Sequence, residues 1–544
     1  MSNDVETCFR KVLEYHEGSK HYPNRFAPGP GHLDWANEPD PFRRYEGAPL
    51  LHLPLLAEDP DVNHFGLYQC QVKPRSLSVP AVAALLELSL GLSAWKSYQG
   101  SSWSLRINPS SGDLHPTECH LLLPPLGGIV GGVFHYDSYH HALEHRAAPP
   151  NEIWSAAEEH FGRNGFLVGL SSITWREAWK YGMRAFRYCG QDLGHALACL
   201  SFSAALLGWR VICLNAVSDE EVATLFGLDR CKWPDQEEEI PQCLLLVQTD
   251  MSSGSPRDLP PGWLSTFTGL SFGGLPNRLS AEHRRWPAIE EITVATAKPR
   301  TPSTTCRPPE SEHLEGEIPG VTAAGSIRRR RSALAFDRRT LLSREHFFAM
   351  LDKTLPRAGS APFDLVAEES CVHLLLFVHR VQGVEPGLYF LVRNAGDLEE
   401  LQRECSPSFC WQRVAAAEPL PLFLLLKGNC QTEAALAGCG QEIASDGAFS
   451  VAMVARFRSN LEVAPWRYRH LHWEAGMIGQ VLYLEAEAHG MRGTGMGCFF
   501  DDVTHKLLGL SGDAFQDFYH FTIGKTVDDP RLITLPPYSH LRHS

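Results

Sequence analysis

An internal repeat constrains the fold of this chain more than any other feature of the sequence. Residues 194–208 and residues 476–490 are both runs of small and apolar residues that begin and end at glycine. Aligning Gly194 with Gly476 also places Asp192 on Glu474 and Gly208 on Gly490, without a gap. The repeat predicts a duplicated α+β domain whose copies pack as an intramolecular dimer. Two unrelated α+β domains with a coincidental spacing are the alternative.

Composition divides the 544 residues into three parts. Residues 1–250 and 326–544 have mixed helix and strand patterning, and each forms one predicted domain. Residues 251–325 contain ten prolines, a density that prevents long helices, so they are predicted to be a mostly extended connector. Within the connector, residues 279–294 are apolar enough to form a short helix.

The order of predicted elements is similar in the two domains. Each has a helix after a serine cap, at Ser78 and at Ser343. A short β-like run follows in each, at residues 119–123 and 372–378, and then a glycine leads into aromatic β residues near Gly132 and Gly387. This shared order favours duplication.

Charge and cysteine usage exclude several classes of protein. The net charge of −14 argues against general attraction to nucleic acids or anionic membranes. The fifteen cysteines form no CxxC pair, and residues 1–20 contain no apolar core of signal-peptide length, so a reducing, cytoplasmic location is expected. The most membrane-like stretches, residues 78–95 and 198–214, are interrupted by charged residues and are predicted to be buried helices.

Four consecutive arginines at residues 328–331 precede Ser332. Such a run is often a solvated surface segment. The alternative is an anion site, because guanidinium groups beside a hydroxyl supply charge-assisted donors to a phosphate. The immediate return to apolar residues favours the rim of a pocket, with Arg330, Arg331 and Ser332 as candidate ligands.

Two further stretches carry polar groups suited to a ligand. Pro109, Ser110, Ser111 and Gly112 predict a tight loop whose hydroxyls and backbone N–H groups can face a bound molecule. Lys180 and Tyr181 are adjacent candidates for proton transfer, although such a pair is more often on a helix surface.

Residues 490–502 contain four glycines within eight residues, which permit close approach of the backbone to a flat or charged ligand. A P-loop and a dinucleotide-binding fingerprint are not indicated, because the spacing of these glycines fits neither motif. The sequence contains no HExxH motif, so a metal site at the histidine-rich residues 134–146 is not expected. A serine hydrolase is not expected either, because the one GxSxG match, at residues 269–273, falls in the predicted extended connector.

Together these stretches resemble the nitroreductase superfamily of FMN enzymes, and in particular its SagB/ThcOx-type dehydrogenase branch. The resemblance spans nearly the whole chain in tandem. Leu334 departs from it, because the family usually has a basic residue there. The matching segments are the arginine–serine start at 330–332, the loop at 106–118, the Lys-Tyr segment at 180–195 and the glycines at 490–502.

The resemblance implies a pair of nitroreductase-like domains with FMN at their interface. The first half has the serine loop and the Lys-Tyr pair, whereas the second has the arginine run and the glycines. Their counterparts are degraded: Lys73-Pro74-Arg75-Ser76 and residues 209–217 in the first half, residues 356–363 and Glu462-Val463 in the second. One working flavin site shared by the halves is therefore expected, together with one vestigial site.

In that site the resemblance assigns residues to parts of the cofactor. Arg330, Arg331 and Ser332 would bind the phosphate, with help from Lys525 or Arg531, and residues 109–112 would contact the ribityl chain or ring. Backbone N–H groups of Gly497 and Cys498 would donate near N5 and O4 of the ring. Lys180 and Tyr181 would transfer protons.

The function implied is two-electron transfer at the flavin N5 on a small-molecule or peptide substrate. The branch oxidises peptide thiazolines or oxazolines, which raises the expectation of a peptide-modifying partner enzyme. The alternatives are an NAD(P)H-dependent nitro or quinone reductase and a non-catalytic scaffold that holds little flavin. The chain is expected to act as a monomer that forms its own pseudo-dimer.

Overall fold

The computed structural model describes residues 2–69, 72–162, 165–250, 256–306, 308–314 and 318–543. Residues 251–255, 307 and 315–317 of the predicted connector lie outside these described residues.

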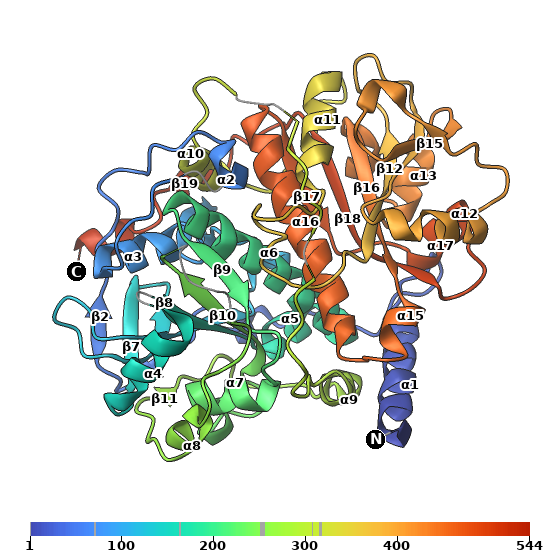
Figure 1. The fold of residues 1–544 in the computed structure, drawn as a ribbon. Coiled ribbons are helices and arrows are strands. Elements are labelled where there is room, and N and C mark those ends of the chain that lie inside the picture. Colours follow the sequence, from blue (N-terminus) through green and yellow to red (C-terminus); the bar gives the residue numbers. More distant parts are fainter. Residues whose placement is uncertain are drawn as a thin grey trace.

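Two seven-stranded antiparallel sheets, one from each half of the chain, are the framework of the fold (Figure 1). The first sheet has the order β2 (Leu50–His52), β7 (Ala142–Ala147), β6 (Gly132–Asp137), β5 (Thr117–Leu123), β8 (Gly165–Ser172), β10 (Ile240–Gln248) and β9 (Arg210–Cys213). The second has the order β14 (Gln412–Arg413), β15 (Leu422–Lys427), β13 (Gly387–Leu391), β12 (Val372–Val378), β16 (Phe449–Arg456), β18 (Phe515–Gly524) and β17 (Arg492–Met496). The six strands other than β2 and β14 follow one another in the same order in both sheets. The edge strands differ, because β2 precedes all other strands of its sheet in the chain, whereas β14 lies between β13 and β15. The six matching strands confirm the predicted duplication at the level of the fold.

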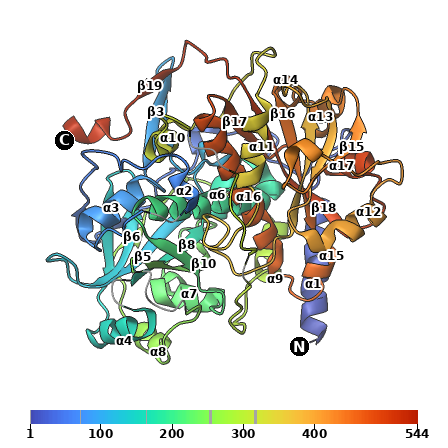
Figure 2. The ribbon, with the colours of Figure 1, turned by 45° about the horizontal axis from the view of Figure 1, so that its top comes forward.

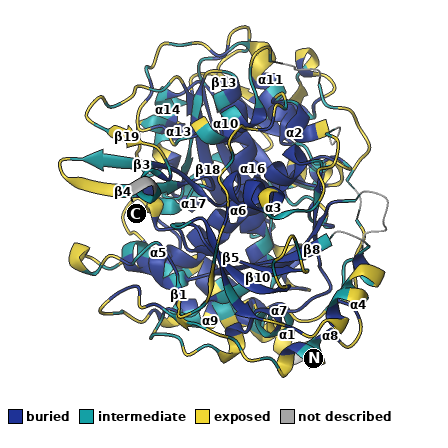
Figure 3. Cartoon of the chain, turned by 90° about the vertical axis from the view of Figure 1, so that its left-hand side faces the viewer, coloured by how far each residue is buried: buried dark blue, intermediate teal, exposed yellow. Residues whose placement is uncertain are grey.

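The two central helices pack against each other between the sheets. They are α6 (Ala185–Leu206) and α16 (Arg467–Ala488), and the alignment that places Gly194 on Gly476 also matches their first and last residues. The two glycines face each other where the helices cross, because a Cβ built on either would lie 2.8 Å from the Cα of the other. Figure 3 shows both helices deep in the buried interior. The largest hydrophobic cluster includes side chains from both helices and both sheets, so the halves share one core.

The predicted serine caps are present in both halves. The Ser78 hydroxyl accepts a hydrogen bond from the Ala81 N–H at the start of α3 (Val79–Glu87). The Ser343 hydroxyl accepts one from the His346 N–H at the start of α11 (Arg344–Lys353). Each cap satisfies a backbone donor that the helix itself leaves unpaired.

The two ends of the chain cross over to the opposite half (Figures 1 and 2). Helix α1 (Ser2–Gly18) lies against the second half, where His16 contacts Gln516 at 3.1 Å. Strand β19 (Ile533–Leu535) pairs with β3 (Leu92–Tyr98), which also pairs with β4 (Ser101–Arg106). The exchanged ends tie the halves together at positions far from the helix crossing.

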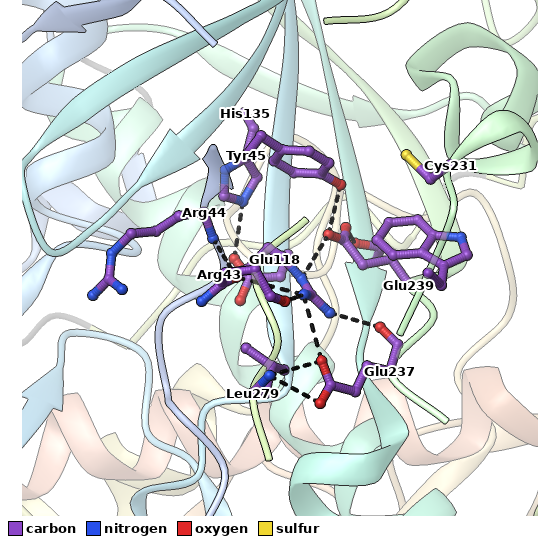
Figure 4. A network of polar contacts seen from close by, with 12 residues as sticks. Arg43, Arg44, Tyr45, Glu118, His135, Cys231, Glu237, Glu239 and Leu279 are labelled. Carbon is purple, nitrogen blue, oxygen red and sulfur yellow. Dashed lines mark hydrogen bonds and ion pairs between the residues drawn. The ribbon is translucent and has the colours of Figure 1, made fainter. Parts of the chain in front are cut away.

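Part of the connector packs against the first sheet and is held there by a buried network of charges. Arg43 forms ion pairs with Glu237 and Glu239, and Glu237 accepts hydrogen bonds from the N–H groups of Leu279 and Ser280 (Figure 4). The elements of this region are β1 (Tyr45–Glu46), β11 (Leu275–Pro276), α8 (Trp263–Thr268), α9 (Pro287–Ala295) and α10 (Ala323–Arg329).

In the predicted histidine-rich stretch, His135 lies between two carboxylates of the first sheet. Its ring nitrogens are 3.1 Å from Glu118 and 2.8 Å from Glu144. Burial opposes the charged form of the ring, but the contacts with the two carboxylates outweigh burial and raise the pKa of His135 to about 9. The side chain therefore acts as the cation of a buried ion-pair network, which gives it a structural role.

Shorter helices either cover the outer faces of the sheets or pack against the two central helices. They are α2 (Gly66–Gln69), α4 (Glu152–Phe161), α5 (Thr174–Tyr181), α7 (Asp219–Phe226), α12 (Leu398–Glu404), α13 (Gln431–Ala437), α14 (Ile443–Asp446), α15 (Arg458–Leu461) and α17 (Asp501–Leu508). Among the described residues, no helix combines the length and the apolar character that crossing a membrane requires.

Candidate functional site

A cavity of about 940 Å³ lies between the two halves of the chain. Its walls come from the serine loop and α6 of the first half, and from the arginine run, α16 and β17 of the second. Ten of the thirteen predicted site residues line it: Pro109, Ser110, Ser111, Gly112, Tyr181, Arg330, Arg331, Ser332, Gly497 and Cys498.

The serine loop is fixed by its own hydrogen bonds and by a carboxylate of α6. The Ser110 hydroxyl accepts a hydrogen bond from the His115 N–H at 2.8 Å. The backbone N–H and the hydroxyl of Ser111 both donate to Asp192 at 3.1 Å. Gly112 has φ +63°, a conformation that other residues rarely adopt, and the loop is therefore held in one shape at the wall of the cavity.

Two buried carboxyl groups, Glu177 of α5 and Asp192 of α6, lie behind this loop. Burial and then the neighbouring Asp192 raise the pKa of Glu177 well above its ordinary value. Burial also raises the pKa of Asp192, to about 7. Because two carboxylates at close range oppose each other's ionisation, the pair retains a proton near neutral pH. The pair therefore holds an exchangeable proton beside the cavity.

Lys180 and Tyr181, the last residues of α5, reach over the serine loop. A Cβ built on Gly112 would lie 2.7 Å from both the Lys180 Nζ and the Tyr181 hydroxyl. The Tyr181 ring packs against Tyr188 with centroids 4.4 Å apart. Burial, followed by the charge of Glu177, raises the pKa of Tyr181, so its hydroxyl remains protonated at neutral pH. Tyr181 lines the cavity, and Lys180 is adjacent to it.

Two arginines that line the same cavity, Arg330 and Arg331, form no ion pair with an acidic side chain of the described residues. Arg330 donates from Nε and Nη2 to the carbonyls of Ile107 and Arg106, and Arg331 donates to the carbonyl of Ser93. No carboxylate in the described part of the chain forms an ion pair with either guanidinium. Burial and the charge of Arg330 lower the pKa of Arg331 to about 10. The charge of Glu487 acts on Arg331 in the opposite direction, but Glu487 forms no ion pair with it. Two adjacent guanidinium groups without an ion-pair partner are suited to an anionic ligand.

The other members of the arginine run differ in their environments. Arg328 pairs with Asp59 and Glu87, both at 2.7 Å, so its charge is neutralised within the protein. The Ser332 hydroxyl lies 2.8 Å from the Tyr483 hydroxyl and also lines the cavity. Arg328 of the run therefore has a structural role, whereas Arg330, Arg331 and Ser332 offer donors to the cavity.

Lys525 and Arg531 do not line the cavity, contrary to their predicted role. Lys525 donates to the carbonyl of Gly490 at 2.9 Å, and Arg531 pairs with Asp529 at 2.7 Å on the surface. The intervening residues 526–530 line the cavity instead, and they include the carboxylates of Asp528 and Asp529. The predicted basic tail is thus replaced by a neutral to acidic rim.

The glycine-rich segment after α16 forms an edge strand, β17. Strand β17 pairs with β18 and ends at Met496, so Gly497 and Cys498 leave the sheet at the cavity. Neither the Gly497 nor the Cys498 backbone N–H donates to another described residue. These two donors are available to a ligand.

A smaller cavity of about 340 Å³ occupies the position related to the first by the repeat. His470, Glu474 and Met477 line it, and the same alignment of the halves places them on Tyr188, Asp192 and His195 of the larger cavity. Pro356 and Phe363 of the degraded loop also line it. Here Arg393 forms an ion pair with Glu474, and Arg456 pairs with Asp397 at 2.6 Å.

The connector covers the strand edge that corresponds to β17 in this smaller cavity. Asn215, just beyond β9, donates to the Thr304 hydroxyl at 2.6 Å, and Thr301 donates to the carbonyl of Asn215. Other segments of the chain already form hydrogen bonds with the backbone after β9, whereas the Gly497 and Cys498 N–H groups have no partner among the described residues. The two cavities therefore differ in volume, in charge and in backbone donors.

Several residues at the larger cavity carry no signal that sequence analysis detected. Tyr188, Gln441, Tyr483 and Tyr519 line its wall, and Glu177 lies behind it. Asp192 was recognised only as a position of the repeat. A buried acid in the middle of an apolar helix is the one local signal that points to a site.

Comparisons with known proteins were made with both sequence and structure. No protein-family model and no curated protein sequence matches the chain. The crystal structure of a candidate nitroreductase from Anabaena variabilis is similar to it, with a TM-score of 0.66, 21% identity, and coverage of 95% of this chain and 99% of the other. The chain has the fold of that protein over nearly its whole length. It consists of two nitroreductase-like halves that form an intramolecular pseudo-dimer.

Two further solved structures match about half of the chain or less. The Escherichia coli microcin synthetase McbBCD complex with truncated pro-MccB17 bound has a TM-score of 0.26, 18% identity, and coverage of 45% of this chain and 94% of that one. An NADPH:FMN oxidoreductase from Vibrio harveyi has a TM-score of 0.21, 14% identity, and coverage of 38% and 69%.

Proposed function

We propose that this protein is an FMN-dependent oxidoreductase with one flavin site, in the larger cavity between the halves. The observation that carries the proposal is the pair of arginines without ion-pair partners, which lines one cavity of about 940 Å³ together with the rigid serine loop. FMN has the matching parts: a phosphate for the cationic wall and a flat ring for the aromatic and backbone walls. When bound, FMN supplies two-electron transfer at its N5 atom.

The residues of the chain would hold the cofactor at three places. Arg330, Arg331 and Ser332 bind the phosphate, and residues 109–112 contact the ribityl chain or the ring. The free N–H groups of Gly497 and Cys498 donate to the ring edge that carries N5 and O4, where negative charge increases on reduction. Lys525 and Arg531 have no part in this arrangement, because both are paired on the surface.

Tyr181 and Lys180 are proposed to move protons to or from the substrate. The Tyr181 hydroxyl stays protonated because of its raised pKa, so it can donate, and Lys180 stands beside it over Gly112. The Glu177–Asp192 pair holds a proton on the other side of the serine loop. This polar side of the cavity faces the arginines across the seam between the halves.

Within this class we propose a SagB/ThcOx-type dehydrogenation of a cyclic residue in a peptide or a related small molecule. The Lys-Tyr pair typical of that branch lies where it can reach a substrate at the ring, which supports the proposal. A partner enzyme that forms the azoline would then have to supply the substrate. Reduction of nitro or quinone compounds by NAD(P)H uses the same cavity and remains the alternative.

The proposal predicts one FMN per chain. Protein reconstituted with excess FMN and passed through gel filtration should retain flavin at about one mole per mole of chain, measured by visible absorbance. Among the described residues, the larger cavity combines two adjacent arginines without ion-pair partners and two free backbone N–H groups, whereas the arginines Arg393 and Arg456 of the smaller cavity are paired with carboxylates. Two FMN per chain would show that the smaller cavity is also functional, and a protein that takes up none would contradict the proposed function.

A second prediction separates catalysis from flavin binding. Replacing Tyr181 by Phe should lower kcat by about a hundredfold or more, the usual contribution of a positioned proton donor, and Lys180→Met should have an effect of similar direction. Both variants should keep flavin at the wild-type ratio. Loss of flavin from either variant would show that the pair has a structural role, and unchanged kcat would remove it from the mechanism.

A further inference from the structure

Two cysteine thiols meet at the edge of the larger cavity. Cys498 follows β17 and lines the cavity, and Cys439 follows α13. Their Sγ atoms are 2.7 Å apart and share a hydrogen bond. The two residues are 59 positions apart in the chain, so the fold and not a local motif brings them together. Among the described cysteines, no other two thiols lie within hydrogen-bond distance.

The segments that carry the two thiols are clamped to each other. The Gln441 side chain donates to the carbonyl of Cys498 at 3.1 Å, and the Phe500 N–H donates to the carbonyl of Ala437 at 2.7 Å. Both thiols are half-buried, so they remain accessible to a small oxidant or reductant. The short distance is therefore a fixed feature of this part of the fold.

The electrostatic environment makes the two sulfurs unequal. The hydrogen bond with Cys439 lowers the pKa of Cys498, and the nearby Arg184 acts in the same direction. The same hydrogen bond, together with burial, raises the pKa of Cys439. Dithiol–disulfide exchange proceeds by attack of a thiolate, so a thiol with a lowered pKa next to a second thiol is suited to it. Isolated buried cysteines such as Cys119 and Cys199 have only raised pKa values.

We propose that Cys439 and Cys498 form a redox-active dithiol–disulfide couple that exchanges two electrons with the flavin in the adjacent cavity. The inference rests on the proposed function, because Cys498 is also the residue whose backbone N–H faces the ring. A disulfide in a reducing compartment is typically transient and catalytic or redox-sensing, which is consistent with such a couple.

The exchange balances as a reversible two-electron step. Reduced FMN gives up two electrons and two protons, and the S–S bond between Cys439 and Cys498 breaks. Each sulfur gains one electron and one proton, so the products are oxidised FMN and two thiols. In the reverse direction the dithiol reduces the flavin and the S–S bond forms.

The first test uses the protein without FMN. After treatment with diamide, proteolysis and mass spectrometry should identify a peptide pair linked through Cys439 and Cys498, and both cysteines should resist alkylation until a reductant is added. Cys410→Ser serves as the control, because Cys410 is an exposed cysteine remote in sequence from both, and it should leave this disulfide unchanged. Two cysteines that remain fully alkylated after oxidation would overturn the proposal.

The second test counts electrons in the protein loaded with FMN. Anaerobic titration of the oxidised holoprotein with dithionite should consume two electron pairs per flavin in the wild type and one pair in Cys439→Ser. Cys439 is the better position for this variant, because its backbone is not proposed to contact the ring. Equal consumption in the wild type and in Cys439→Ser would overturn the exchange.

The two proposals fail in different ways. A protein that binds no FMN fails the proposed function, and with it the exchange, whatever the disulfide mapping shows. A protein that binds one FMN per chain but consumes a single electron pair retains the proposed function and loses only the cysteine couple.

Discussion

A protein in which Arg330 and Ser332 are both replaced by Ala should purify without FMN and should not retain it after reconstitution. Charge-assisted hydrogen bonds contribute about 1.5–3 kcal/mol each, so loss of two ligands of the phosphate should weaken binding at least about a hundredfold. The reason for so large an effect is that no carboxylate of the described chain neutralises Arg330, whose charge is therefore available to the phosphate. Flavin absorbance per chain after gel filtration gives the measurement.

The control for this experiment comes from the first half of the chain. Arg75 and Ser76 are the counterparts of Arg330 and Ser332 in the repeat, and both side chains are exposed on the surface. Replacing them by Ala should leave flavin retention within about twofold of the wild type, since exposed positions contribute little. Equal losses in both double variants would contradict the assignment of the site to the larger cavity.

Arg330 also has a structural role that the experiment must separate from binding. Its guanidinium donates to the carbonyls of Arg106 and Ile107, which precede the serine loop, so Ala at this position removes a link between the halves. Arg331→Gln provides the second variant, because Arg331 does not touch those carbonyls. It should reduce flavin affinity by about tenfold or more, while loss of its hydrogen bond to the Ser93 carbonyl should lower the free energy of unfolding by no more than about 1.5 kcal/mol, measured by urea denaturation.

The fold was largely predictable from the sequence because the repeat is visible in small residues. Gly194 and Gly476 recur at matching positions because the backbone of one helix approaches each of them too closely for a side chain. This requirement keeps glycine at both positions even where the surrounding sequences differ. The serine caps and the apolar strands are local signals of the same kind. The exchange of the chain ends was not predictable, because the pairing of β19 with β3 depends on contacts between segments far apart in the chain, such as that between the Tyr538 hydroxyl and the Leu92 N–H.

The parts of the site that are contiguous in sequence were predictable. The parts that depend on contacts between distant segments were not. The serine loop and the arginine run were both found in the sequence, and the structure brings them to one cavity. The resemblance assigned Lys525 or Arg531 to the phosphate, but local acceptors bind both side chains. Cys439 gives no local signal at all, because its significance depends on a partner, Cys498, that only the fold brings close.

Replacing Gly194 by Ala should destabilise the protein strongly, although alanine has a higher helix propensity than glycine. In an exposed helix this change stabilises by up to about 1 kcal/mol, because Ala loses less conformational freedom on folding. In α6 a Cβ on Gly194 would lie 2.2 Å from the carbonyl oxygen of Trp473 and 2.8 Å from the Cα of Gly476. Backbone atoms of a packed helix yield little, so we expect a loss of about 3 kcal/mol in the free energy of unfolding, measured by urea denaturation.

The symmetry of the crossing makes the test sharper. Gly476→Ala should cost a similar amount, since its Cβ would lie 2.2 Å from the carbonyl oxygen of Gln191. Gly512→Ala is the control, because a Cβ there meets nothing within 4 Å, and it should change stability by no more than about 0.5 kcal/mol. If Gly194→Ala were as stable as the wild type, the two helices would not cross at these glycines. The cavity would then lose a fixed wall, because residues of both helices, such as Asp192 and Tyr483, line it.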